Sequence, residues 1–111
     1  NASIGNGLNP VLFKNVPIPE EYAVSQNYPN PFNPVTNIRF ELPENADVSI
    51  SVFNARGQLV TELTSGNYSA GYHEIQWKGT DLYGIPVSSG VYIYSVRAGD
   101  FHSIKKMLLV K

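Results

Sequence analysis

The chain has 111 residues, of which 42% are hydrophobic and 15% charged, with a formal net charge of -1 at pH 7. This length fits one domain, and the balanced charge argues against a basic surface for nucleic acid or an anionic membrane. Cysteine is absent, which excludes disulfides and thiolate chemistry, and no apolar run approaches the roughly 20 residues of a membrane span.

Residues 1–23 differ in character from the rest and are expected to form an extended N-terminal arm or linker. Pro17 and Pro19 exclude a helix there. The apolar side chains of this arm are those of Val11, Leu12, Phe13, Val16 and Ile18. Such a segment would expose apolar area to water, so we expect it to fold back on its own domain or to add a strand to a neighbouring copy. No signal peptide is recognisable at the start.

The run Asn-Tyr-Pro-Asn-Pro-Phe-Asn-Pro at 27–34 cannot pair inside a sheet, because it carries three prolines. Turn or polyproline geometry is expected instead. The run is predicted to be a rigid entry corner, with Tyr28 and Phe32 plugging the open end of a β-sandwich rather than binding a ligand.

From residue 36 onward, short segments alternate between apolar and polar side chains with period two, which is typical of strands. Strands are expected at 36–42, 47–53, 58–63, 72–78, 91–98 and 101–111. Gly57 is expected to end a hairpin loop with positive φ, a loop is expected around 65–67, and Gly99-Asp100 reads as a two-residue hairpin turn.

Trp77 is interpreted as the core anchor of the sandwich rather than as a sugar platform. The last strand is expected to be covered on both faces and to supply Ile104, Met107, Leu109 and Leu108 to the core. The positions given a structural role are Tyr28, Pro29, Pro31, Phe32, Pro34, Gly57, Trp77, Gly90 and Tyr92.

These features predict an all-β protein, an immunoglobulin-like antiparallel β-sandwich of about seven strands, with the domain at 24–111 and the arm at 1–23.

Several short motifs occur in a characteristic order. They are Tyr28-Pro29-Asn30-Pro31-Phe32-Asn33-Pro34, Val52-Phe53-Asn54, Ala70-Gly71-Tyr72-His73, Trp77, Gly90-Val91-Tyr92 and Lys105-Lys106-Met107. With them, the chain from about Val24 resembles the type A C-terminal sorting domain of proteins exported by the type IX secretion system. It also resembles the related immunoglobulin-like domain of the flagellar hook-capping protein.

The resemblance implies that an outer-membrane translocon reads the last strands, with Lys105, Lys106, Met107 and Lys111 as the candidate sorting signal. It also implies a secreted protein, or one on the outer cell surface of a Gram-negative-type bacterium. From physics alone, the lysines are edge-strand charges that discourage aggregation.

No catalytic constellation is recognisable, and an enzyme is the least supported reading. His73 and His102 fall on separate strands without further ligands at metal spacing, so no metal and no cofactor is expected. Asp81 is expected to cap backbone amides in its long loop, with calcium binding as the alternative.

Three functions compete. The first is a non-catalytic sorting or anchoring module whose partner is the outer-membrane secretion machinery. The second is a filament subunit whose arm pairs with copies of itself to form a homo-polymer. The third is a carbohydrate-binding module, which rests on fold analogy. Nucleic acid is not expected as a partner.

Overall fold

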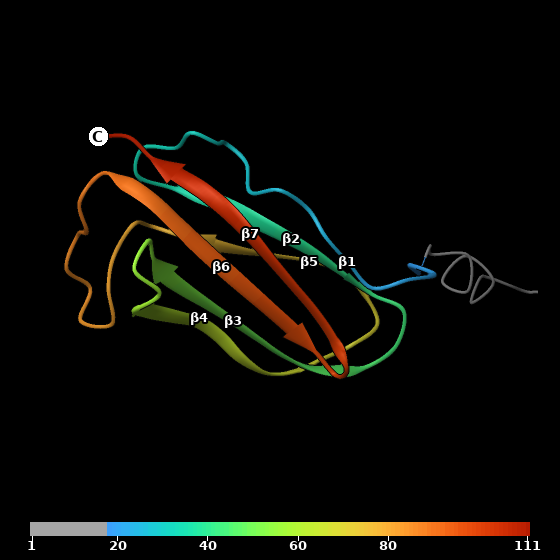
Figure 1. Cartoon of the computed structure of the whole chain (residues 1–111). Helices are drawn as coiled ribbons and strands as arrows, with labels where there is room; N and C mark the ends of the chain where they lie inside the picture. Colours follow the sequence, from blue (N-terminus) through green and yellow to red (C-terminus); the bar gives the residue numbers. More distant parts are fainter. Residues whose placement is uncertain (1–17) are drawn as a thin grey trace, which may run out of the picture.

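The structure, a computed structural model, describes residues 18–111, and all their regular elements are strands arranged in two antiparallel sheets (Figure 1). The three-stranded sheet has the order β1-β2-β5, with β1 at Ala23–Val24, β2 at Thr36–Leu42 and β5 at Gly71–Trp77. The four-stranded sheet has the order β4-β3-β6-β7, with β3 at Ala46–Asn54, β4 at Leu59–Tyr68, β6 at Gly90–Ala98 and β7 at Phe101–Leu109. The prediction of an all-β sandwich is confirmed.

The core lies between the two sheets because each strand directs alternate side chains inward. In β2 and β3 the large apolar residues that point inward are Ile38, Phe40, Leu42, Val48, Ile50 and Val52, and none is more than 1% exposed. Tyr92, Tyr94 and Val96 of β6 continue the same core. The alternation read from the sequence therefore identified the correct inward face of these strands.

Trp77 closes one end of this core, as predicted. Its ring lies 5.6 Å from that of Phe32 and 5.2 Å from that of Tyr92, measured between centroids. The indole Nε1 donates a hydrogen bond of 2.9 Å to the carbonyl oxygen of Thr80. Phe32 is 2% exposed, so its predicted role as a plug is confirmed.

The same prediction was wrong for Tyr28, whose side chain is 78% exposed. Its backbone pairs with that of Asn37 in an antiparallel bridge. Residues opposite each other in such a pair project to the same side, and Asn37 lies on the outer side of β2. Tyr28 is therefore turned away from the core.

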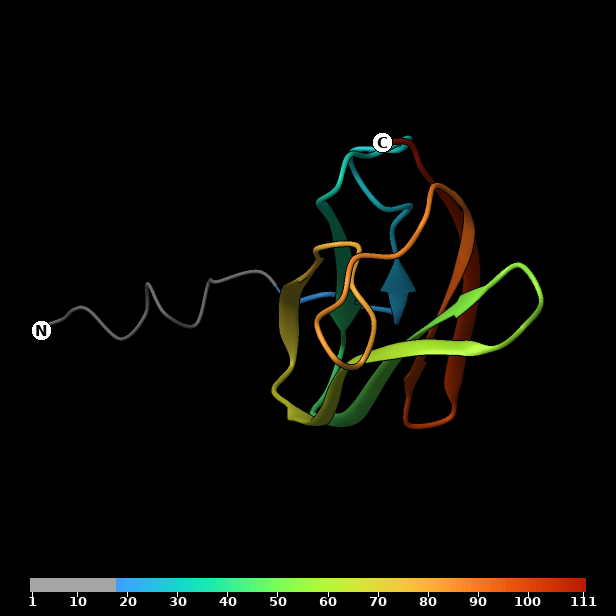
Figure 2. The same cartoon turned by 90° about the vertical axis from the view of Figure 1, so that its left-hand side faces the viewer.

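The entry corner itself is built from three cis prolines, Pro29, Pro31 and Pro34. The hairpin loop after β3 is also as predicted. Gly57 has a φ of +83°, and the Asn54 side chain accepts hydrogen bonds from two backbone amides of the loop. This hairpin projects beyond the sheets (Figure 2).

The loop expected around 65–67 is instead part of β4, which runs on to Tyr68. Ser65 pairs with Ser49 and Asn67 with Asp47, because β3 begins early enough to offer partners along this length. Pairing with a long neighbour outweighs the weak strand preference of Ser, Gly and Asn.

The expectation that β7 is covered on both faces is also wrong. Met107 and Leu109 are 2% and 1% exposed, whereas Ile104 and Leu108 are 61% and 38% exposed. Successive side chains of a strand point to opposite faces, and Ile104 and Leu108 are an odd number of residues from Met107, so they lie on the outer face of the sheet.

Of the arm residues, Val11, Leu12, Phe13 and Val16 lie outside the described residues, and Ile18 is 58% exposed. Within 18–111, no helix is found that could cross a membrane.

Candidate interaction surfaces

The C-terminal strand β7 lies at an edge of the four-stranded sheet, and its second half is capped by the proline-rich segment. The backbone amide of Phe32 donates to the Leu108 carbonyl, and the Val110 amide donates to the Phe32 carbonyl, each at 2.9 Å. Side chains complete the cap, because Asn30 Oδ1 accepts from the Leu108 amide and Gln26 Nε2 donates to the Lys106 carbonyl. The sequence reasoning missed this cap, although an asparagine between two prolines, Asn30, was a signal for it.

The first half of β7 has an open edge. The two-residue turn at Gly99-Asp100 sets the pairing with β6, so that the backbone groups of His102 and Ile104 face away from the sheet. Within residues 18–111 these groups have no hydrogen-bond partner. A short segment of unpaired strand edge is thus left between the hairpin turn and the cap.

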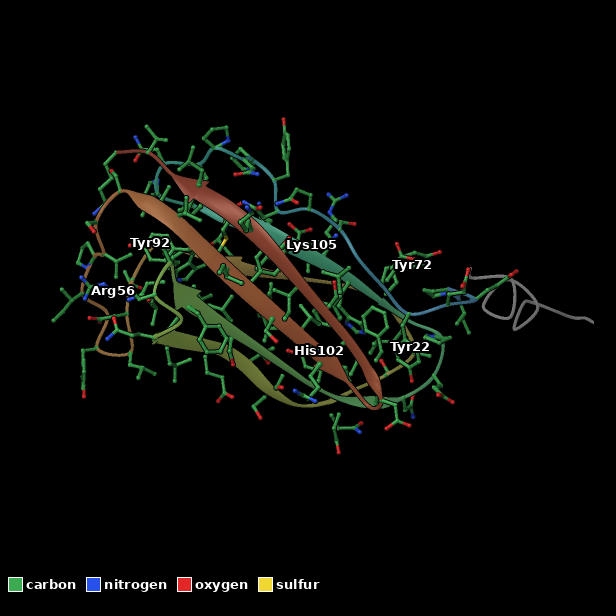
Figure 3. All side chains as sticks on the ribbon, in the orientation of Figure 1. Tyr22, Arg56, Tyr72, Tyr92, His102 and Lys105 are labelled. Carbon is green, nitrogen blue, oxygen red and sulfur yellow. The ribbon has the colours of Figure 1, made fainter. Side chains whose placement is uncertain are left out.

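The four candidate sorting residues do not form one patch. Lys105, labelled in Figure 3, pairs with Tyr94 and is half-buried on the inner side of β7. Lys106 pairs with Ile93 and is exposed on the outer side. Met107 is in the core. Lys111 is exposed, and its backbone amide donates to Ser89 Oγ. In the folded domain, Lys106 and Lys111 are therefore the accessible members.

Tyr94 fastens the chain segment that precedes the prolines. Its hydroxyl donates a hydrogen bond to the Ser25 carbonyl and accepts one from the backbone N–H of Asn27, both at 2.9 Å. Asn27 is 2% exposed, and its Nδ2 donates to Thr36 Oγ1 at 3.0 Å. Burial raises the pKa of Tyr94 to about 12, so the hydroxyl keeps its proton at neutral pH.

The segment held by Tyr94 forms one wall of a groove on the outer face of the three-stranded sheet. Two adjoining hollows, of about 470 and 330 Å³, share Ser25, Arg39 and Glu74 in their lining. Tyr72 lines the first hollow and Tyr28 the second. Arg39 Nε lies 3.4 Å from Glu74 Oε1, and this ion pair is largely exposed to solvent.

The candidate polar sites have local structural partners. The His73 ring stacks on Phe40, and its Nε2 lies 2.7 Å from the Ser69 carbonyl oxygen. On the other sheet, His102 Nε2 lies 2.8 Å from Ser95 Oγ. Among residues 18–111, no three His, Cys, Asp or Glu side chains gather where they could hold a metal ion.

Asp81 caps its loop as predicted. Its Oδ1 accepts hydrogen bonds from the backbone amides of Tyr83 and Ile85, at 2.9 and 3.0 Å.

Two facing antiparallel sheets of three and four strands, closed by a buried tryptophan, define an immunoglobulin-like sandwich. Residues 27–100 match the family described as the FlgD Ig-like domain, and the chain belongs to this family. No curated protein matches the chain.

Solved structures with a similar fold include two proteins of Porphyromonas gingivalis and one of P. aeruginosa. Dimeric latent PorU from Porphyromonas gingivalis is 21% identical with a TM-score of 0.63, covering 81% of this chain and 9% of that one. PorZ, described as a surface component of the type-IX secretion system of the same bacterium, is 20% identical with a TM-score of 0.55, covering 83% of this chain and 12% of that one. FlgD from P. aeruginosa is also 20% identical, with a TM-score of 0.54, and the match covers 67% of this chain and 58% of that one. The chain therefore spans about a tenth of the length of the first two.

Proposed function

We propose that the chain is a non-catalytic sorting or anchoring module of a secreted or cell-surface bacterial protein, read by type IX secretion machinery at the outer membrane. The family match and the fold similarity to PorZ and PorU support this proposal, together with the motifs from residue 28 to residue 107. The domain would occupy residues 24–111, and residues 1–23 would form an extended arm or linker.

The observation that carries the proposal is the form of β7. Its first half is an open strand edge at His102 and Ile104, and exposed lysines stand at 106 and 111. An exporter could add a strand to this edge and contact the lysine ammonium groups with carboxylates. Met107 is buried, so it would contribute to recognition by holding β7 in place.

The test is export of a reporter protein fused in front of the chain, in a bacterium that has this secretion system. We expect the Lys106→Ala/Lys111→Ala double variant to reduce export, whereas Lys78→Ala, an exposed lysine after β5, should not. All three positions are exposed, so the melting temperatures should stay close to that of the parent domain. Failure of the parent fusion to be exported would refute the proposal, and normal export of the double variant would remove these lysines from it.

A filament subunit is the second candidate, favoured by the outer edge of β5. Within 18–111 this strand pairs only with β2, so its other side is open along Gly71–Trp77. The arm residues Val11, Leu12, Phe13 and Val16 of a neighbouring copy could add a strand there, which would produce an open head-to-tail polymer.

Removing residues 1–17 and measuring the mass in solution tests this second candidate. Pro19 is buried, so the truncation should stop before it. An assembling full chain and a monomeric truncation would support the filament. A full chain that remains monomeric at high concentration would refute it.

A further inference from the structure

The groove on the outer face of the three-stranded sheet is lined by aromatic and charged side chains that have no part in the proposed sorting or assembly. We call it the tyrosine groove, and its lining includes Tyr28, Asn37, Arg39, Glu41, Tyr72 and Glu74. Its two hollows adjoin and share Arg39 and Glu74, so the groove is continuous across the sheet face.

The register of the strands places the two tyrosines at opposite ends of the groove. Tyr28 pairs with Asn37 and Tyr72 pairs with Glu41. Asn37 and Glu41 are four residues apart on β2, which corresponds to roughly 13 Å along an extended strand. Tyr72 marks the end of the groove nearer Tyr22, where the described chain begins (Figure 3).

Both rings are exposed and unused by the fold. Tyr28 is 78% exposed and Tyr72 is 60% exposed, and within residues 18–111 neither ring belongs to an aromatic pair and neither hydroxyl has a hydrogen-bond partner. By contrast, the hydroxyls of Tyr92 and Tyr94 bond to backbone carbonyls, at Ser88 and Ser25. The two groove rings are thus available as flat apolar surfaces for a ligand.

Between the rings, the floor offers planar polar groups with unused hydrogen-bonding capacity. Arg39 uses Nε towards Glu74, and its remaining guanidinium N–H groups are unpaired within the described chain. The Glu41 carboxylate is an acceptor without a partner among residues 18–111, and the Asn37 side chain makes only long contacts, at 3.4 Å, with the Tyr28 carbonyl and the Gln76 side chain. Aromatic faces at the ends and alternating donors and acceptors between them match the apolar faces and hydroxyl edges of sugar rings.

The charges and the topology select among ligands. One guanidinium and two carboxylates give the groove a negative balance, which disfavours acidic polysaccharides and nucleic acid. A peptide that binds by adding a strand needs a free sheet edge, but the groove lies on the face of β2, whose two edges are already paired with β1 and β5. We propose that the tyrosine groove binds a neutral glycan chain along β2, with one sugar ring stacked on Tyr72 and another on Tyr28.

The experiment is titration calorimetry of the full 111-residue chain with cellohexaose, laminarihexaose and mannohexaose, and with oligogalacturonate as an acidic comparison. We expect at least one neutral probe to bind. Tyr28→Ala and Tyr72→Ala should each weaken its binding by about tenfold, the usual scale for losing an aromatic anchor. Tyr28→Phe and Tyr72→Phe should retain most of the binding because the ring remains.

Tyr83→Ala is the matched control, because Tyr83 is 85% exposed but lies on the loop after Asp81, outside the groove lining. It should bind as the parent chain does. No binding of any neutral probe at millimolar concentration would overturn the proposal. Equal losses of affinity in Tyr83→Ala and in the groove variants, or tighter binding of oligogalacturonate than of the neutral probes, would also overturn it. A peptide of residues 8–17 that binds the parent chain but not the groove variants would show that the groove takes a peptide instead, and would overturn it as well.

Discussion

Replacing Tyr94 by Phe removes one buried hydroxyl while leaving the ring to fill the core. The hydroxyl makes two hydrogen bonds of 2.9 Å, to the Ser25 carbonyl and from the Asn27 amide. Asn27 is 2% exposed, so its backbone N–H would lose its acceptor and could not bond to water instead. A net loss of about 1 kcal/mol per hydrogen bond, plus the cost of an unsatisfied buried donor, gives a destabilisation of roughly 2–4 kcal/mol.

Urea unfolding at pH 7 measures this loss, and Tyr92→Phe serves as the control on the same strand. The Tyr92 hydroxyl donates to a single loop carbonyl, that of Ser88, so its removal should cost only about 1 kcal/mol. A cost for Tyr94→Phe below that of the control would refute the assignment of Tyr94 as the fastener of residues 25–27.

The same tyrosine gives a pH signature. Its pKa is raised to about 12 in the folded domain, so its contribution to stability is fully present below pH 10 and is lost as the pH rises through 12. Raising the pKa of Tyr94 from 10.0 to about 12 corresponds to roughly 2–3 kcal/mol of folding stability. Tyr94→Phe lacks this titration, so the difference in unfolding free energy between parent and variant should shrink between pH 10 and 12. A constant difference across that range would contradict the argument.

Three further changes test the core, a turn and a loop. Trp77→Ala should cost roughly 3–5 kcal/mol in chemical denaturation, as deletion of a buried aromatic does, and a loss under about 1 kcal/mol would contradict its role as core anchor. Gly79→Ala should destabilise the domain by roughly 1–3 kcal/mol in thermal melts, because φ is +70° and the added Cβ would lie 3.1 Å from the Pro34 carbonyl oxygen. Gly66→Ala is the control: its Cβ would meet nothing within 4 Å, so the melting temperature should hardly change. Asp81→Ala should lower the unfolding free energy by about 1 kcal/mol, because the hydrogen bonds from the Tyr83 and Ile85 amides are lost. A calcium chelator should leave the melting temperature of the parent chain unchanged, and a fall of several degrees would indicate a calcium site.

Sequence periodicity predicted the sandwich and most of its core, because β2 and β3 each alternate between an apolar face and a mostly polar face. Both faces of β7 carry apolar residues, so the alternation pattern alone could not tell whether Ile104 or Met107 faces inward. The register with β6, set by the hairpin turn at Gly99-Asp100, decides for Met107. A count of residues from that turn would have separated the two sets.

The groove and the cap on β7 could not be predicted because both depend on pairings between distant segments. Tyr28 looked like a plug beside Phe32, since both are aromatic residues among prolines. Its exposure follows from the bridge to Asn37, which no local pattern encodes. Likewise, Asn30 reaches β7 across 78 positions of the sequence. Such contacts follow from the tertiary fold and leave only faint signs in composition.

The arrangement of the terminal strands determines how the domain would respond to tension. The first described residues, blue in Figure 1, and the C-terminus lie at opposite ends of the sandwich, so a pull between them acts along the strand axes. On the C-terminal side, nine residue pairs with β6 and the bridge to Phe32 would share the force in shear. On the other side, β1 has only two pairs with β2, and the hydroxyl of Tyr94 adds a second attachment just behind it. The first part to yield under load would therefore be the segment from Ile18 to Val24, while the clamp at Tyr94 keeps the remainder of the sandwich closed.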